Sequence, residues 1–301
     1  MADLLRLGMI GLDTSHVEAF TDLLHNPQNP WHLPGARVVA AFPGGSADFA
    51  MSQSRVAGFT AKLRDQYQVE IMDSPEAVAA ASDALLLEAV DGRAHLELFR
   101  RIAPTGKPVF IDKPFAVSTA DAGAMLALAQ QHRVPLMTCS ALRYAAALTA
   151  VLAKTPQAEI IGADFYGPLN LEPTQPGFFW YGIHTAEMLF ATLGKGCETV
   201  TVTTAADHDL AVGRWRDGRL GTLRGNRQGN HTFGGLVHRR EGSWFVDVPS
   251  QPKPYYASLM EQLLRFFASR ESPVDPAESL EIVRFLEAAN ESRATGHPVA
   301  L

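Results

Sequence analysis

The chain has 301 residues, 47% of them apolar and 19% charged, which is typical of a folded globular protein and excludes a disordered or fibrous chain. A formal net charge of −6 without a basic cluster argues against nucleic acid and anionic membranes as partners. Its two cysteines, Cys139 and Cys197, form no disulfide framework and no zinc-binding spacing. The start, MADLLRLGMIGLD, does not read as a signal peptide, so we expect a cytoplasmic protein.

The first half of the chain alternates strand-like and helix-like segments. We expect strands over residues 5–10, 37–42, 69–72, 83–90, 108–111 and 135–139, and helices over 16–25, 54–67, 74–81, 93–102 and 119–132. Strands that alternate with helices imply right-handed crossovers between parallel neighbours. The pattern therefore predicts an α/β Rossmann-like domain, with a doubly wound parallel sheet, over residues 1–142.

The second half gathers its strands together. We expect strands over residues 159–166, 199–204, 210–215, 220–224, 234–238 and 244–248, and helices up to 153 and over 184–193, 254–270 and 276–293. Asp217-Gly218 is a hairpin signal between two of these strands. This pattern predicts that residues 143–301 form an α+β domain with an open, mainly antiparallel sheet. Trp215, Phe233 and Trp244, in or beside strands, favour a homodimer formed through this domain.

The first turn stands where a dinucleotide-binding protein carries the motif GxGxxG. It runs through Gly11, Leu12, Asp13, Thr14, Ser15 and His16. Only the first glycine is present, because Asp13 takes the second place and His16 the third. Ser15 followed by Glu18 reads as a capping box that begins a helix. The turn predicts a nucleotide-binding-like fold.

Polar residues gather at the expected carboxyl ends of the strands, where open α/β sheets bind their ligands. They are Asp13, Thr14, Ser15, His16, Glu88, Asp91, His95, Asp112 and Lys113. Lys113 precedes Pro114 at a strand end, so it is either an ordinary surface lysine or a group that exchanges a proton. Asp91 and His95 either belong to the site or merely begin their helix.

Several segments resemble the Gfo/Idh/MocA oxidoreductases, the glucose-fructose oxidoreductase and inositol dehydrogenase family. VFIDKP, residues 109–114, is similar to the EKP motif, and VDGRAH, residues 90–95, to a strand-end loop that ends in histidine. ALRY, residues 141–144, resembles the segment that joins the domains. GIH, residues 182–184, is similar to the catalytic histidine element, and GHPV, residues 296–299, to the tail. In this order, the segments cover essentially the whole chain.

The resemblance implies an NAD(P)-dependent oxidoreductase that transfers hydride to or from a sugar, polyol or related hydroxy or keto compound. Lys113 and His184 would handle the substrate proton. The implied NAD or NADP contacts are Gly11, Leu12, Asp13, Thr14, Ser15, His16, Pro43, Gly44, Glu88, Asp91, His95, Asp112, Lys113 and Arg143. The implied substrate contacts are Arg143, Trp180, Tyr181 and His184. Trp180 departs from the family, which carries an aspartate at this place. Backbone amides of the segment Pro43-Gly44-Gly45-Ser46, with Arg55 nearby, would favour a 2′-phosphate and hence NADP.

Two other functions stay open. The acids and histidines at the strand ends, with His184, suit a divalent ion and a metal-assisted hydrolase, lyase or isomerase. No pair has HxH or HExxH spacing, so the sequence assigns no metal ligands. The third alternative is a family member that has lost catalysis and senses or scaffolds a ligand.

Overall fold

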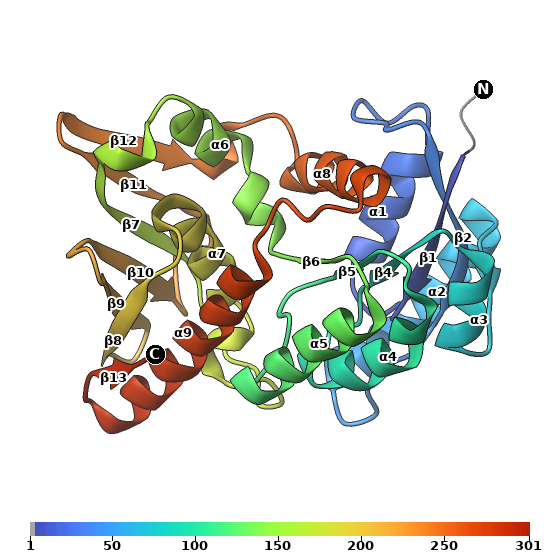
Figure 1. Cartoon of the computed structure of the whole chain (residues 1–301), viewed down its shortest axis with the longest axis horizontal. Coiled ribbons are helices and arrows are strands. Elements are labelled where there is room, and N and C mark those ends of the chain that lie inside the picture. Colours follow the sequence, from blue (N-terminus) through green and yellow to red (C-terminus); the bar gives the residue numbers. More distant parts are fainter. Residues whose placement is uncertain (1–3) are drawn as a thin grey trace. The chain divides into compact units, whose positions relative to one another are not determined.

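The computed structural model describes residues 4–301, and its contacts divide the chain into two compact units (Figure 1). Unit 1 comprises Met1–Ala116, Ala120–Cys139 and Leu259–Pro276. Unit 2 comprises Val117–Thr119, Ser140–Ser258 and Ala277–Leu301. The segment Leu259–Pro276 therefore packs with unit 1, although it lies inside the range 143–301 predicted for the second domain.

Unit 1 is built on a six-stranded sheet in which every neighbouring pair is parallel. Its strands are β1 (Leu5–Ile10), β2 (Ala36–Phe42), β3 (Glu70–Ile71), β4 (Ala84–Leu87), β5 (Val109–Ile111) and β6 (Leu136–Thr138). The order β3-β2-β1-β4-β5-β6 is that of a Rossmann fold. The predicted doubly wound parallel sheet is confirmed, and its central strands are wholly buried, as both faces are covered.

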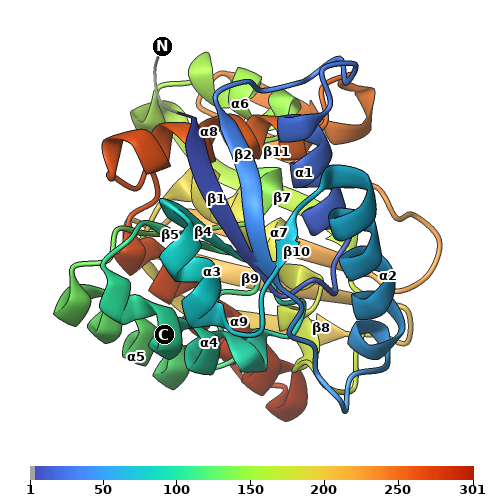
Figure 2. The same cartoon turned by 90° about the vertical axis from the view of Figure 1, so that its right-hand side faces the viewer.

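The helices of unit 1 are α1 (His16–His25), α2 (Ala50–Tyr67), α3 (Pro75–Ala81), α4 (His95–Ile102) and α5 (Thr119–His132). In Figure 2, α1 and α2 lie on one side of β1 and β2, and α3 lies on the other. α3 begins as its sequence predicts, because Ser74 accepts a hydrogen bond from the Ala77 N–H and Pro75 occupies the first turn.

The predicted capping box at α1 is wrong. Ser15 already has helical backbone angles and its side chain makes no capping hydrogen bond, whereas a capping residue needs an extended backbone. Glu18 instead pairs with Lys62 on α2. α2 also begins at Ala50, four residues before the predicted start.

Unit 2 contains a seven-stranded sheet in the order β12-β11-β7-β10-β9-β8-β13. The strands are β7 (Ile160–Pro168), β8 (Cys197–Thr204), β9 (His208–Trp215), β10 (Leu220–Asn226), β11 (Gly234–Arg239), β12 (Gly242–Asp247) and β13 (Val299–Ala300). Only β7 and β10 pair in parallel. The predicted open, mainly antiparallel sheet is confirmed, and Asp217-Gly218 forms the predicted turn between β9 and β10.

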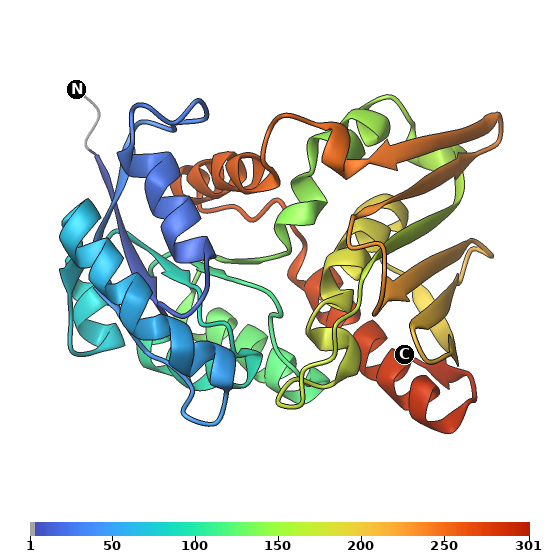
Figure 3. The same cartoon turned by 180° about the vertical axis from the view of Figure 1, so that it is seen from behind.

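Helices of unit 2 cover one face of this sheet. They include α6 (Ala146–Ala153), α7 (Gly182–Leu193) and α9 (Pro276–Thr295), while α8 (Tyr255–Ser269) crosses from unit 2 into unit 1. α7 packs on β7 and β10 (Figure 3). Phe190 of α7 meets both Trp215 of β9 and Phe285 of α9, at centroid distances of 5.5 and 5.6 Å. Trp215 therefore belongs to the core and is not part of an exposed face.

Several large apolar side chains point away from this core. Leu210, Leu220, Leu236 and Phe245 are exposed, and Leu236 and Phe245 face each other across the β11–β12 pair. Trp244 is exposed too, but it pairs with the buried Val237 and so lies on the opposite side of its strand.

Among the helices described in residues 4–301, none has the length and apolar character needed to cross a bilayer.

Candidate active site

The turn after β1 brings three strand ends together. Gly11 has φ +88°, and a Cβ added there would overlap the backbone of Ala89. The Gly11 N–H donates to the Phe42 carbonyl at 2.9 Å, and the Leu12 N–H donates to the Pro43 carbonyl at 2.7 Å. Only glycine tolerates this conformation at this packing, as the first glycine of a dinucleotide-binding turn requires.

Asp13 joins this turn to its neighbours. Its side chain is buried, and its carboxylate accepts hydrogen bonds from Ser52 Oγ at 2.6 Å and from the Val90 N–H at 2.9 Å. Burial raises the pKa of Asp13, although both hydrogen bonds oppose the shift. The side chain thus has a structural role, linking the turn to α2 and to the loop after β4.

A buried cluster of His16, Glu88 and Asp112 lies at the ends of β1, β4 and β5. His16 is the first residue of α1, and its Nδ1 lies 2.6 Å from Asp112 Oδ2 and 3.9 Å from Glu88 Oε2. Ligand atoms of the three side chains all lie within 4.8 Å of one another. The predicted polar gathering at the strand ends therefore includes one close cluster.

The two carboxyl groups of the cluster differ in their electrostatics. Burial raises the pKa of Glu88 well above its usual value, the charge of Asp112 adds to this, and the charge of Lys113 opposes it. Burial would also raise the pKa of Asp112, but the charge and hydrogen bond of His16 and the charge of Lys113 hold it below its usual value. Lys113 is itself buried and precedes a cis peptide bond to Pro114.

Other predicted residues of unit 1 hold loops in place. Asp91 accepts hydrogen bonds from the N–H and guanidinium of Arg93, and so begins the short 3₁₀ helix Gly92–Ala94. His95 is wholly buried; Nε2 lies 2.7 Å from the Ala89 carbonyl and Nδ1 3.1 Å from the Phe115 carbonyl. The contacts of Asp91 support the alternative that it begins a helix, whereas those of His95 are with the loops that follow β4 and β5.

The remaining predicted residues of unit 1 lie along the two turns. Thr14 is buried and Ser15 is exposed in the turn after β1. Pro43 and Gly44 follow β2, where Gly44 adopts φ +62° and a Cβ on it would lie 3.4 Å from Gly11 Cα. The ends of β1 and β2 are therefore in close backbone contact.

In unit 2, His184 lies in the first turn of α7. Its Nδ1 is 2.6 Å from Ser140 Oγ, and its ring meets Tyr181 and Phe233 at centroid distances of 5.7 and 5.5 Å. Trp180 is buried and meets Tyr181 edge-on at 5.9 Å. Phe233 thus helps to position His184, a contact that the sequence did not indicate.

Arg143 lies between two acidic side chains of unit 2. Its Nε donates to Glu187 Oε2 at 2.8 Å, and its Nη2 donates to Glu278. Burial raises the pKa of Glu187, and the Arg143 charge opposes this shift. These ion pairs connect the segment Ala141–Tyr144 to α7 and α9, which is a structural role within the unit.

Unit 2 contains a hollow of about 440 Å³ that is lined in part by Phe233, the residue whose ring contacts His184. Its lining includes His231, Thr232, Phe233, Lys253 and Tyr255. The size and the mixture of aromatic and polar side chains are those of a small-molecule pocket. The sequence did not point to it, because its residues come from loops without a recognisable motif.

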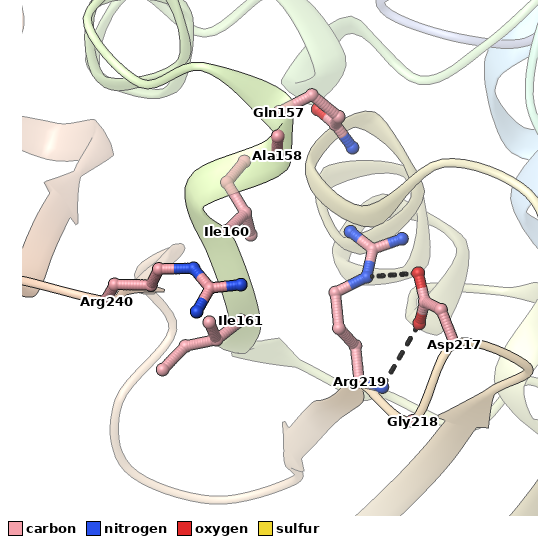
Figure 4. Close-up of a pocket in the computed structure, with 8 residues that line it drawn as sticks. All are labelled: Gln157, Ala158, Ile160, Ile161, Asp217, Gly218, Arg219 and Arg240. Carbon is pink, nitrogen blue, oxygen red and sulfur yellow. Dashed lines mark hydrogen bonds and ion pairs between the residues drawn. The ribbon is translucent and has the colours of Figure 1, made fainter.

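Another hollow of unit 2, of about 690 Å³, lies by the turn between β9 and β10 (Figure 4). Arg219 and Asp217 in its lining are paired with each other at 2.8 Å, and Arg219 also donates to the Leu193 carbonyl. None of the residues predicted for the site is among the eight that line this hollow.

The fold and the strand-end residues define a class: a Rossmann domain followed by an α+β domain. Residues 5–139 match the model of the GFO_IDH_MocA family, described as an oxidoreductase family with an NAD-binding Rossmann fold. This match covers less than half of the chain, and it assigns the N-terminal part, residues 5–139, to the Gfo/Idh/MocA oxidoreductases. The family named from the sequence motifs is thereby confirmed, and NAD is the cofactor of that family.

Solved structures share the fold over the full chain. A myo-inositol dehydrogenase from Corynebacterium glutamicum is 15% identical, with a TM-score of 0.77 and 99% of each chain covered. The WlbA dehydrogenase from Bordetella pertussis, in complex with NADH and UDP-GlcNAcA, is 16% identical, with a TM-score of 0.77 and the same coverage. A myo-inositol dehydrogenase from Lactobacillus casei, in complex with NAD(H) and myo-inositol, is 17% identical, with a TM-score of 0.73 and 99% of this chain and 97% of that chain covered. No curated protein matches the chain.

Proposed function

We propose that the protein is an NAD(P)-dependent dehydrogenase or reductase that acts on the CH–OH group of a sugar, polyol or related hydroxy or keto compound. The observation that carries the proposal is Lys113, a buried lysine at the end of β5, which acts electrostatically on Glu88 and Asp112. Family membership and fold support it. Residues 1–142 would bind the nucleotide, and residues 143–301 would bind the substrate.

The first turn of unit 1 fits a dinucleotide. Gly11 has the required positive φ, the β2 end lies against it, and the N-terminus of α1 offers backbone N–H groups to a phosphate. The Asp13 carboxylate accepts hydrogen bonds from Ser52 and Val90. Residues 11–16, with Pro43 and Gly44, would therefore hold the cofactor, and bound NAD(P) supplies the hydride acceptor or donor.

Lys113 and His184 are the proposed proton-transfer groups. Oxidation of an alcohol requires a proton to leave oxygen as hydride leaves carbon, and the Lys113 Nζ or the His184 imidazole would take that proton. Ser140, Tyr181 and Phe233 hold the His184 ring. The hollow lined by Phe233 would receive part of the hydroxylated substrate. Trp180 and Tyr181, which precede His184 in the chain, would contact the substrate as well.

Nucleotide titration and turnover test this function. We expect NADH or NADPH to quench intrinsic fluorescence on binding, and Lys113→Met to lower kcat by at least ~100-fold while nucleotide binding persists. Lys62→Met removes the ion-pair partner of Glu18 and is the matched control, which should leave kcat and nucleotide binding unchanged. If neither NADH nor NADPH binds at millimolar concentration, the proposal is contradicted. Binding without any effect of Lys113→Met favours the non-catalytic alternative.

We also propose a cytoplasmic homodimer. Cys139 and Cys197 are buried free thiols, in keeping with a reducing compartment. Leu210, Leu220, Leu236 and Phe245 lie exposed on strands of the unit 2 sheet, and a second copy of the chain would cover them.

A further inference from the structure

We propose that His16, Glu88 and Asp112 form a binding site for a divalent transition-metal ion such as Mn²⁺ or Zn²⁺. The three side chains come from the start of α1 and the ends of β4 and β5, all in unit 1. The ion-binding role proposed for these three residues is distinct from the proton-transfer role proposed for Lys113 and His184.

The geometry of the cluster suits a single ion. His16 Nδ1 lies 2.6 Å from Asp112 Oδ2 and 3.9 Å from Glu88 Oε2, and the three ligand atoms all fall within 4.8 Å of one another. Bonds of about 2.0–2.2 Å to a tetrahedral ion place its ligand atoms roughly 3.4 Å apart. The widest separation exceeds that spacing by at most about 1.4 Å, so rotamer adjustments of about the length of one covalent bond would bring the three atoms to it.

Glu88 provides an independent indication of a ligand. It is completely buried, and neither of its carboxylate oxygens has a hydrogen-bond partner among residues 4–301. A buried polar group without a partner is costly, and such a group in a folded protein calls for an explanation such as an ion. An ion between His16 and Asp112 would give a Glu88 oxygen the partner that the chain does not supply.

The donor set decides which ions fit. Two carboxylates and one imidazole match the ligands of Zn²⁺ and also accept Mn²⁺, whereas Mg²⁺ and Ca²⁺ prefer oxygen donors alone. The two carboxylates together carry the charge that a divalent ion neutralises. The ion would thereby remove negative charge from the edge of the sheet where the N-terminus of α1 is positioned to bind phosphate.

Direct ion binding tests the site without nucleotide or turnover. The full chain is treated with EDTA, freed of the chelator and titrated by calorimetry with Mn²⁺, Zn²⁺ and Mg²⁺, and Co²⁺ absorption reports on the ligand set. We expect one Mn²⁺ or Zn²⁺ per chain and much weaker binding of Mg²⁺. Glu88→Gln and His16→Gln should each weaken Mn²⁺ binding by at least ~10-fold.

Asp13→Asn is the matched control, because Asp13 is a buried carboxylate at the same edge whose oxygens are taken by Ser52 and Val90. It should leave Mn²⁺ affinity within about threefold of the parent chain. Circular dichroism confirms that each variant is folded, and His16→Gln serves if Glu88→Gln does not fold. The proposal is overturned if the parent chain binds neither Mn²⁺ nor Zn²⁺. It is also overturned if folded Glu88→Gln and His16→Gln variants bind Mn²⁺ as tightly as the parent chain does. Neither result affects the dehydrogenase proposal, which rests on nucleotide binding and Lys113.

Discussion

His25 at the end of α1 couples the stability of unit 1 to pH. Its Nε2 accepts a hydrogen bond from the Val38 N–H of β2 at 3.0 Å. Burial, aided by the charge of Arg37, lowers the pKa of His25 from 6.5 to about 4. Between pH 4 and pH 6.5 the folded state therefore binds fewer protons than the unfolded state. The stabilisation that the neutral His25 side chain provides is complete above pH 6.5 and is lost as the pH falls toward 4.

We predict that His25→Gln reduces this pH dependence, because a glutamine oxygen accepts from the same N–H without titrating. Urea denaturation at pH 7 and pH 4.5 measures the change in the free energy of unfolding. The parent chain should lose more stability at the lower pH than the variant does. His297→Gln, at an exposed position, should behave like the parent, and equal losses in parent and His25→Gln would show that His25 does not contribute.

Asp13 offers a second prediction for single residues. Removal of its carboxylate by Asp13→Ala leaves the buried Val90 N–H and Ser52 hydroxyl without their acceptor, which costs about 1–3 kcal/mol of unfolding free energy. Chemical denaturation of Asp13→Ala, Ser52→Ala and the double variant measures their coupling. We expect the double variant to lose less stability than the sum of the single losses, and strict additivity would contradict the contact.

The sequence predicts residue positions better than residue contacts. The strand-end argument placed His16, Glu88 and Asp112 at one edge of the sheet. It could not show that His16 pairs with Asp112, which is 96 positions away. Arg143 makes the same point, because its partner Glu278 is 135 residues distant. Such pairings depend on the spacing of strands and helices, which no local pattern records.

Two helices of unit 1 contain glycines that the packing does not require. Gly58 in α2 and Gly123 in α5 have no atom within 4 Å of an added Cβ, and neither has a positive φ. We predict that Gly58→Ala and Gly123→Ala each raise the free energy of unfolding by about 0.5–1 kcal/mol, since alanine loses less backbone entropy in a helix. Gly11→Ala is the contrasting variant, and denaturation should show a loss of stability there. A loss at Gly58 or Gly123 would contradict the argument.

Element boundaries follow the sequence where local chemistry sets them. α5 spans the predicted residues 119–132, and α3 begins at the predicted Ser74-Pro75 signal. β4 ends at Leu87, three residues before the predicted end at residue 90. The chain leaves the strand there, because Glu88 belongs to the buried cluster and Ala89 packs against Gly11. The two-residue strand β13 has no periodic pattern of its own, and it depends on pairing with β8.

At the scale of the whole molecule, the fold class follows from the order of predicted elements. The alternation in the first half predicts the parallel sheet, and the grouped strands predict the mixed sheet. The amphipathic pattern over residues 254–270 predicts a helix but does not specify the unit with which it packs, and the segment Leu259–Pro276 belongs to unit 1. An apolar stripe defines a buried face, whereas its partner is set by the complete fold.

The proposed homodimer is tested at the same scale. Leu236 and Phe245 are adjacent across β11 and β12 and are both exposed, so a charge at each would face the second copy in a dimer formed through this surface. We predict that the parent chain sediments as a dimer and that Leu236→Asp with Phe245→Asp converts it to a folded monomer, because burying an unpaired carboxylate costs several kcal/mol. Trp244→Ala, on the opposite side of β12, is the matched control and should remain dimeric. A monomeric parent chain at micromolar concentration, or a doubly substituted chain that stays dimeric, would show that this surface does not hold two copies together.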